Sequence, residues 1–138
     1  MNTNARAFML CAQQAAKLFG AKGGRIVAVT SIGSVRVLPG YAAVGASKAA
    51  LEAIVRYFAS ELAPSGIAVN AVSGGPVDTA SLDFFPDREA LVAEWTRRTP
   101  AGRIARPEEI AAVALFLLSE DAGWITGQTV VADGGLTL

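Results

Sequence analysis

The sequence predicts an α/β fold in which three strands and their connecting helices form one half of a doubly wound parallel sheet. Short apolar runs rich in Val, Ile and Ala lie between turn signals, as is typical of strands buried on both faces. They are RIVAVT at 25–30, IAVNAV at 67–72 and QTVVA at 128–132. Helical patterns separate them, and strands that alternate with helices form parallel sheets. A complete doubly wound sheet has two βαβαβ halves, so three strands make up one half.

Four segments account for the helices. Residues 3–19 carry a wide apolar face that ends at a Gly-rich turn, and residues 41–62 repeat a polar residue every fourth position. Residues 80–99 are amphipathic and aromatic, and we expect Pro86 in the first turn of a short helix there. Pro107, followed by two glutamates, favours a helix start, and that helix runs to about Ser119.

The composition excludes several classes of function. Lys plus Arg and Asp plus Glu number 12 each, which gives no electrostatic footprint for nucleic acid or an anionic membrane. With one Cys and no His, neither a typical zinc site nor a Ser-His-Asp triad is available, so we expect no metal. The N-terminus lacks the pattern of a secretory signal and no apolar stretch is long enough to span a bilayer, which predicts a cytoplasmic protein.

The candidate site lies where the strands end. Ligands of open α/β sheets bind outside the carboxyl ends of the strands. The loops at those ends are 31–41 and 73–81, and the third strand closes with Asp133-Gly134-Gly135. The site is therefore expected to gather Ser31, Tyr41, Lys48 and the turn from Gly75 to Thr79. No glycine-rich strand–turn–helix of the type that binds dinucleotide phosphates is present, so the nucleotide-binding half is expected to be absent.

Five motifs in order resemble the C-terminal half of short-chain dehydrogenases/reductases. They are Ser31 with Tyr41-x6-Lys48, VNAV at 69–72, GPVDT at 75–79, TPxGR with PEEI between 99 and 110, and GQ with DGG between 127 and 135. The resemblance covers essentially the whole chain. It implies that residues 1–138 are a partial Rossmann-like domain containing the catalytic and substrate half.

One departure from the superfamily pattern indicates which branch of the superfamily the sequence resembles. The usual catalytic Tyr lies four residues before the Lys, and Val44 occupies that position here. The Tyr41-x6-Lys48 spacing, and the proline at 76, are similar to those of enoyl-acyl-carrier-protein reductases, and the stretch looks closest to the NADPH-dependent type III branch. In enoyl reduction the charge develops on the thioester oxygen, away from the carbon that accepts hydride. A phenol displaced by about one helical turn, ~5 Å, suits that oxygen.

The resemblance implies a role for each candidate residue. Tyr41 would stabilise the enolate and supply a proton, and Ser31 would assist catalysis. Lys48 would bind the nicotinamide ribose and lower the pKa of the phenol. The cofactor, NADPH or NADH, would also contact the turn at Gly75, Pro76, Val77 and Thr79.

Simpler structural roles remain open for the same residues. A tyrosine at a helix start, such as Tyr41, is often only half-buried packing. Lys48 is placed to pair with Glu52 at i,i+4 on a solvated face. Ser31 and the Gly75 turn suit purely local connections as well. Asn4 resembles a proton-relay asparagine, but it is equally suited to cap a helix.

The predicted function is reduction of the 2,3 double bond of an enoyl thioester in fatty-acid or related acyl synthesis, on a substrate attached to acyl carrier protein or another thiol. Two alternatives remain, a ketoreductase or alcohol dehydrogenase, and a truncated non-catalytic oligomerisation or partner-binding chain. The resemblance further implies a homo-oligomer built through helices 3–19 and 41–62, with no nucleic-acid or membrane partner.

Overall fold

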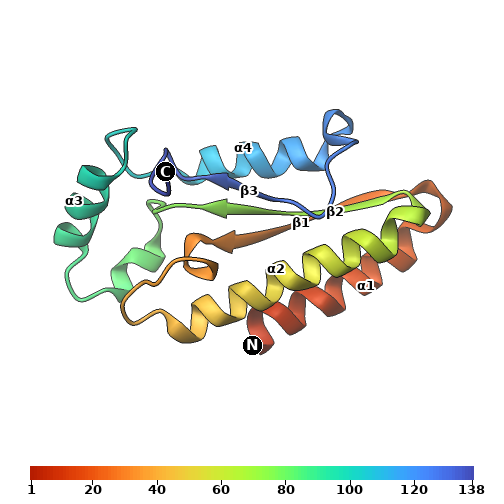
Figure 1. Cartoon of the computed structure of the whole chain (residues 1–138), viewed down its shortest axis with the longest axis horizontal. Coiled ribbons are helices and arrows are strands. Elements are labelled where there is room, and N and C mark those ends of the chain that lie inside the picture. Colours follow the sequence, from red (N-terminus) through yellow and green to blue (C-terminus); the bar gives the residue numbers. More distant parts are fainter.

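The computed structural model describes all residues from 1 to 138 and forms three layers, with a central sheet between helices (Figure 1). Strands β1 (Gly24–Ser31), β2 (Ile67–Gly74) and β3 (Thr129–Ala132) are parallel and lie in the order β1-β2-β3. The predicted half of a doubly wound parallel sheet is therefore confirmed. No helix is both long and apolar enough to cross a membrane.

Two helices cover one face of the sheet and a third covers the other. Helices α1 (Ala7–Phe19) and α2 (Ala42–Leu62) lie side by side below the sheet in Figure 1, and α4 (Pro107–Leu118) lies above it. Helix α3 (Arg88–Arg98) stands apart at the carboxyl end of the strands. Each predicted helix and strand is present at nearly the expected bounds.

The core consists of two apolar clusters, one on each face of the sheet. Under α1 and α2 the fully buried residues Val55 and Val69 meet Ala28 and Ile67. Under α4, Val72 packs against Leu117 and Ile110. Because β2 contributes to both clusters, it is buried along nearly its whole length, as its apolar sequence predicts.

Two local expectations are wrong. Pro86 precedes the helix instead of lying in its first turn, because the Asp87 carboxylate accepts a hydrogen bond from the Ala90 amide and so caps α3 at residue 87. Asn4 does not cap a helix either. It lies inside a π-helical segment, Asn2–Arg6, and its amide donates to Ser47 Oγ on α2 at 2.8 Å.

Candidate active site

The three strands end together at one edge of the sheet. Ser31 pairs in register with Gly74, and Gly74 with Ala132. The loops that follow these residues therefore meet at the left-hand end of Figure 1, beside α3. This is the arrangement that the sequence predicts for the candidate site.

Tyr41 packs against the loop that follows β1. It is the N-terminal boundary residue of α2, and its carbonyl accepts a hydrogen bond from the Gly45 amide at 2.7 Å. Its ring covers Gly33 so closely that a Cβ on Gly33 would lie 2.6 Å from the ring carbon Cδ1. The absence of a side chain at Gly33 thus allows the ring of the half-buried Tyr41 to pack on the loop two residues after Ser31.

Lys48 reaches the same end of β1 from α2. Its Nζ donates to the Val29 carbonyl at 2.8 Å, two residues before Ser31. Partial burial lowers its pKa from the ordinary value of 10.5. The alternative role of Lys48, a surface pair with Glu52, is not observed. Glu52 is buried and accepts a hydrogen bond from Thr30 Oγ1 at 2.7 Å.

Ser31 makes local hydrogen bonds. Its Oγ accepts from the Gly33 amide at 3.1 Å, and its carbonyl accepts from Ser34 Oγ at 2.8 Å. These bonds shape the turn against which Tyr41 packs. The hydroxyl proton of Ser31 remains available to another acceptor, since a serine hydroxyl both donates and accepts.

The turn at 75–79 is held from outside by a second segment. The Ala105 amide donates to the Pro76 carbonyl and the Asp78 amide donates to the Ala105 carbonyl, both at 2.9 Å. The backbone groups of Val77, between them, take no part in these bonds. Close packing requires a glycine at position 75, because a Cβ there would lie 2.8 Å from the Cβ of Asp133.

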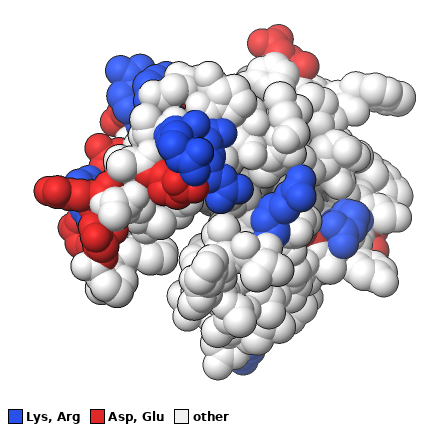
Figure 2. All heavy atoms as spheres, turned by 60° about the vertical axis from the view of Figure 1, so that its left-hand side comes forward, with Lys and Arg blue, Asp and Glu red and all other residues white.

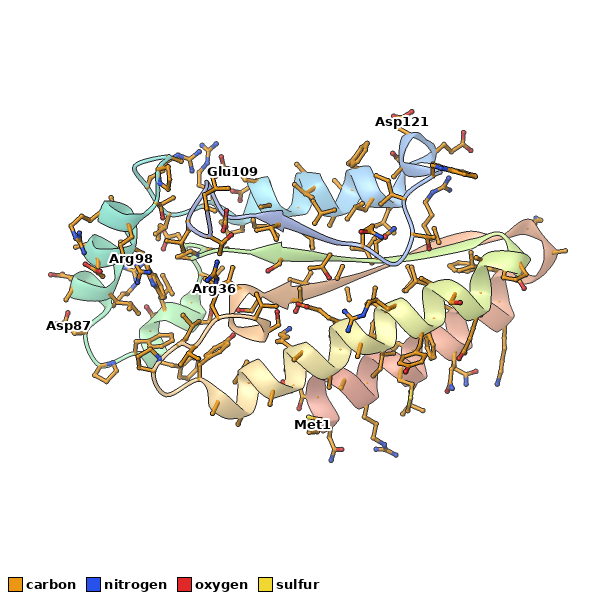
Figure 3. The ribbon with its side chains drawn as sticks, in the orientation of Figure 1. Met1, Arg36, Asp87, Arg98, Glu109 and Asp121 are labelled. Atoms are coloured by element: carbon orange, nitrogen blue, oxygen red, sulfur yellow. The ribbon has the colours of Figure 1, made fainter.

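The C-terminal residues close one side of the site, a feature that the motif at 133–135 does not reveal by itself. The Asp133 carboxylate accepts hydrogen bonds from the Gly135 amide at 2.9 Å and from the Thr137 amide at 3.0 Å. Arg36, in the loop after β1, donates to the Thr137 carbonyl at 3.1 Å (Figure 3). The C-terminal turn therefore joins the loop after β1 to the end of β3.

Beside this turn lies a cavity of about 220 Å³, with Thr99, Pro76 and Asp133 among its lining residues. Arg103 and Glu109 at its border form an ion pair at 2.6 Å, and this pairing lowers the pKa of Glu109 to about 2. Acidic and basic side chains lie next to one another on this side of the molecule, and the remainder of the face is largely uncharged (Figure 2).

The sequence motifs did not identify three of these contacts. Glu52 belongs to the polar stripe of the helix predicted at 41–62, where the sequence pattern suggests a solvent-facing residue. Its burial is visible only in the structure. The Asn4–Ser47 bond and the Arg36–Thr137 bond join residues far apart in sequence, so no local spacing predicts them.

Comparisons with known proteins identify the family of this chain. A sequence model of the family described as enoyl-(acyl carrier protein) reductase matches residues 1–137. The chain is similar to 1-cyclohexenylcarbonyl-CoA reductase of Streptomyces collinus, with 52% identity over 98% of this chain and 49% of the relative. The chain thus spans about half the length of the curated relatives it matches.

Solved structures show the same likeness. The enoyl-acyl carrier protein reductase of Bacillus cereus, solved with NADP+ and an indole naphthyridinone, superposes with a TM-score of 0.89 and 37% identity over 95% of this chain and 51% of that one. A structure described as a putative betaketoacyl-ACP reductase superposes with a TM-score of 0.84 and 39% identity, over 97% of this chain and 56% of that one. The chain belongs to the enoyl-(acyl carrier protein) reductase family of the short-chain dehydrogenases/reductases.

Proposed function

We propose that this chain is the catalytic and substrate half of an NAD(P)H-dependent reductase that acts on the 2,3 double bond of an enoyl thioester, in fatty-acid or related acyl synthesis. The observation that carries the proposal is that Tyr41 and Lys48, seven residues apart, contact the chain on either side of Ser31: the Tyr41 ring lies on Gly33, and the Lys48 ammonium donates to the Val29 carbonyl. The relative from Streptomyces collinus, by its name a reductase of a cyclohexenyl thioester, supports the same substrate class.

The residues present suit a nicotinamide nucleoside. An ammonium has three donors, and Lys48 uses one of them on Val29, which leaves donors for ribose hydroxyls. The unused backbone groups of Val77 and the hydroxyl of Thr79 suit a carboxamide, which both donates and accepts. When bound, the cofactor supplies the hydride that goes to the β-carbon of the substrate.

Tyr41 serves the oxygen of the thioester. Hydride addition at the β-carbon leaves negative charge on this oxygen, and a phenol hydroxyl directed at it stabilises the enolate by a hydrogen bond. The same hydroxyl then donates its proton to the enolate oxygen, and transfer of a proton to the α-carbon, as the enol becomes the saturated thioester, completes the reduction.

The test is reduction of crotonyl-CoA by this chain assembled with a nucleotide-binding half. The loss of NADPH absorbance measures the rate. Tyr41→Phe is expected to lower the rate by about 100-fold or more, the usual contribution of a positioned acid. Tyr57→Phe is the matched control, because Tyr57 lies on the same helix with 70% of its surface exposed. An unchanged rate in Tyr41→Phe would contradict the assignment of the acid. Residues 1–138 alone are expected to show weak or no turnover, because the pyrophosphate lacks a glycine-rich anchor.

Ketoreduction is the second candidate, favoured by the likeness to a betaketoacyl-ACP reductase structure. Val44, at the position of the tyrosine usual in that group, has no proton to donate. The assay with a 3-oxoacyl thioester separates the two activities, and faster reduction of that substrate than of crotonyl-CoA would favour ketoreduction. Absence of both activities in the assembled protein would favour a non-catalytic, partner-binding role.

A further inference from the structure

Glu52 is a buried carboxylate that takes no part in the proposed chemistry. It lies within α2, is 6% exposed and accepts a hydrogen bond from Thr30 Oγ1 at 2.7 Å. Thr30 is buried to the same extent. The ion pairs of the chain all lie elsewhere, so no ion pair balances this carboxylate. Acidic side chains are rarely buried in this way, because their removal from water costs free energy.

An apolar side chain would serve the stability of the fold at least as well at this position. The helix and the strand that Glu52 joins otherwise meet through apolar residues, among them Leu51 and Val55 of α2 and Ala28 of β1. Replacement of a buried charged group by packed apolar residues is often neutral or stabilising. The role of Glu52 therefore lies in what its hydrogen bond orients.

The bond joins the two elements that carry the candidate catalytic residues. Thr30 directly precedes Ser31 at the end of β1. Glu52 lies one helical turn after Lys48, on the helix that begins after Tyr41. Apolar contacts are non-directional and permit small sliding movements of a helix on a sheet, whereas a hydrogen bond is directional. The Thr30–Glu52 bond therefore fixes where α2 lies along β1.

No other buried side chain of α2 duplicates this link to the sheet. Ser47, 2% exposed, accepts a hydrogen bond from Asn4 at 2.8 Å, but Asn4 belongs to the segment before α1. Lys48 also reaches β1, but it is only half-buried, and in the proposed function its ammonium also serves the ribose. The bond of Glu52 is thus the buried polar contact that holds α2 against β1.

We propose that Glu52 is a positioning residue of the reaction: its hydrogen bond with Thr30 sets where α2 lies along β1, and thereby where the Tyr41 phenol lies relative to Ser31 and the substrate oxygen. This inference rests on the proposed function. Glu52 acts through Thr30 and through the backbone of α2. Small movements are sufficient, because a misplacement of about 1 Å lowers a rate by up to about 100-fold.

The decisive variant combines Thr30→Val with Glu52→Leu in the chain assembled with a nucleotide-binding half. It removes donor and acceptor together, so its free energy of unfolding should equal or exceed that of wild type. Its kcat for crotonyl-CoA should nevertheless fall by about tenfold or more, with little change in KM. Wild-type turnover, a change in KM alone, or a fall in turnover that accompanies a less stable fold would overturn the inference.

Two single variants supply a rescue and a control. Glu52→Gln keeps an oxygen that accepts from Thr30, so it should retain most of the turnover that the double variant loses. Glu61→Leu removes an exposed carboxylate from the same helix and should leave turnover and stability unchanged. Equal losses of turnover in Glu52→Gln and the double variant, or in Glu61→Leu and the double variant, would overturn the inference.

A readout without turnover separates this inference from the proposed function. The Tyr41 ring lies against Gly33, so the nuclear Overhauser effect between the ring protons and the Gly33 α-protons reports where α2 lies relative to the loop after β1. In residues 1–138 it should weaken in the double variant and persist in Glu52→Gln. If this is observed but the assembled protein fails to reduce crotonyl-CoA, only the proposed function fails. An unchanged effect in the double variant overturns the inference whatever the activity.

Discussion

At the scale of single residues, the two ionisable groups with the clearest environments are Lys48 and Glu109. The Lys48 ammonium donates to the Val29 carbonyl and is partly buried there, and this burial lowers its pKa below 10.5. The Glu109 carboxylate accepts from both Arg103 nitrogens and from the Arg106 amide, and its pKa is about 2. The two groups therefore change the stability of the fold in different pH windows.

Lys48 is expected to make the protein more stable as pH rises. Between its lowered folded-state pKa and the ordinary 10.5, the unfolded chain binds the proton and the folded chain does not, so the free energy of unfolding increases through this window. Denaturant titrations of wild type and Lys48→Met across this range measure the difference. A difference that stays constant with pH, or that falls as pH rises, would contradict the burial of the charged ammonium.

Glu109 is expected to lose its contribution in acid. Its folded-state pKa is depressed, so the contribution is fully present above pH 4.5 and is lost as the pH falls toward about 2. Glu109→Gln should therefore be less stable than wild type near neutral pH, and the two should converge in strong acid. The Lys48→Met variant serves as the control, since its difference from wild type should not change in this acid range.

At the scale of elements, the sequence predicted most bounds correctly and missed contacts between distant segments. The strands and the helix at Pro107 carry their own signals, in apolar runs and in a proline followed by glutamates. The predicted start of the helix near Pro86 was wrong because Asp87, a residue type that also favours a helix start, caps α3 instead. Cys11 belongs to the apolar face predicted for residues 3–19 but is exposed, because a wide apolar face does not show which part of it meets the sheet.

One buried side-chain amide joins β2 to the loop that precedes β3. Asn70, 1% exposed, donates to the Ile125 carbonyl at 2.8 Å and accepts from the Gln128 amide at 3.0 Å. Asn70→Ala should lower the free energy of unfolding by about 2 to 4 kcal/mol, because both partners are left without it. Gln128→Ala, at an exposed side chain of the same loop, should change it by about 0.5 kcal/mol or less. Similar losses in both variants would contradict a special role for Asn70.

At the scale of the whole molecule, the sequence predicted a half-sheet and the edge at which the loops after its strands meet, because both follow from the order of strands and loops. It did not predict that Lys48 is engaged at the edge of β1, since that depends on which side of β1 lacks a neighbour. Nor does spacing alone determine where the Tyr41 hydroxyl is directed, so its catalytic role stays a prediction. The same is true of assembly through α1 and α2.

We expect the chain to form a dimer through α1 and α2. Small residues on α2, among them Ala46, Ala49 and Ala53, would allow close approach of a second copy. Ala46→Arg places a long charged side chain at an exposed position of this helix and should shift sedimentation from dimer to monomer. Ala90→Arg, an exposed site on α3, should leave the dimer intact. Sedimentation of the wild type as a well-folded monomer would contradict the expected assembly.

The turn held by Asp133 has a practical consequence for handling the protein. Thr137 is tied to the Asp133 carboxylate and, through its carbonyl, to Arg36 in the loop that carries Tyr41 at its far end. An affinity label fused directly after Leu138, or trimming by a carboxypeptidase, would therefore disturb that loop although neither touches it. A purification handle belongs at the amino end of the chain, or behind a long flexible spacer at the carboxyl end.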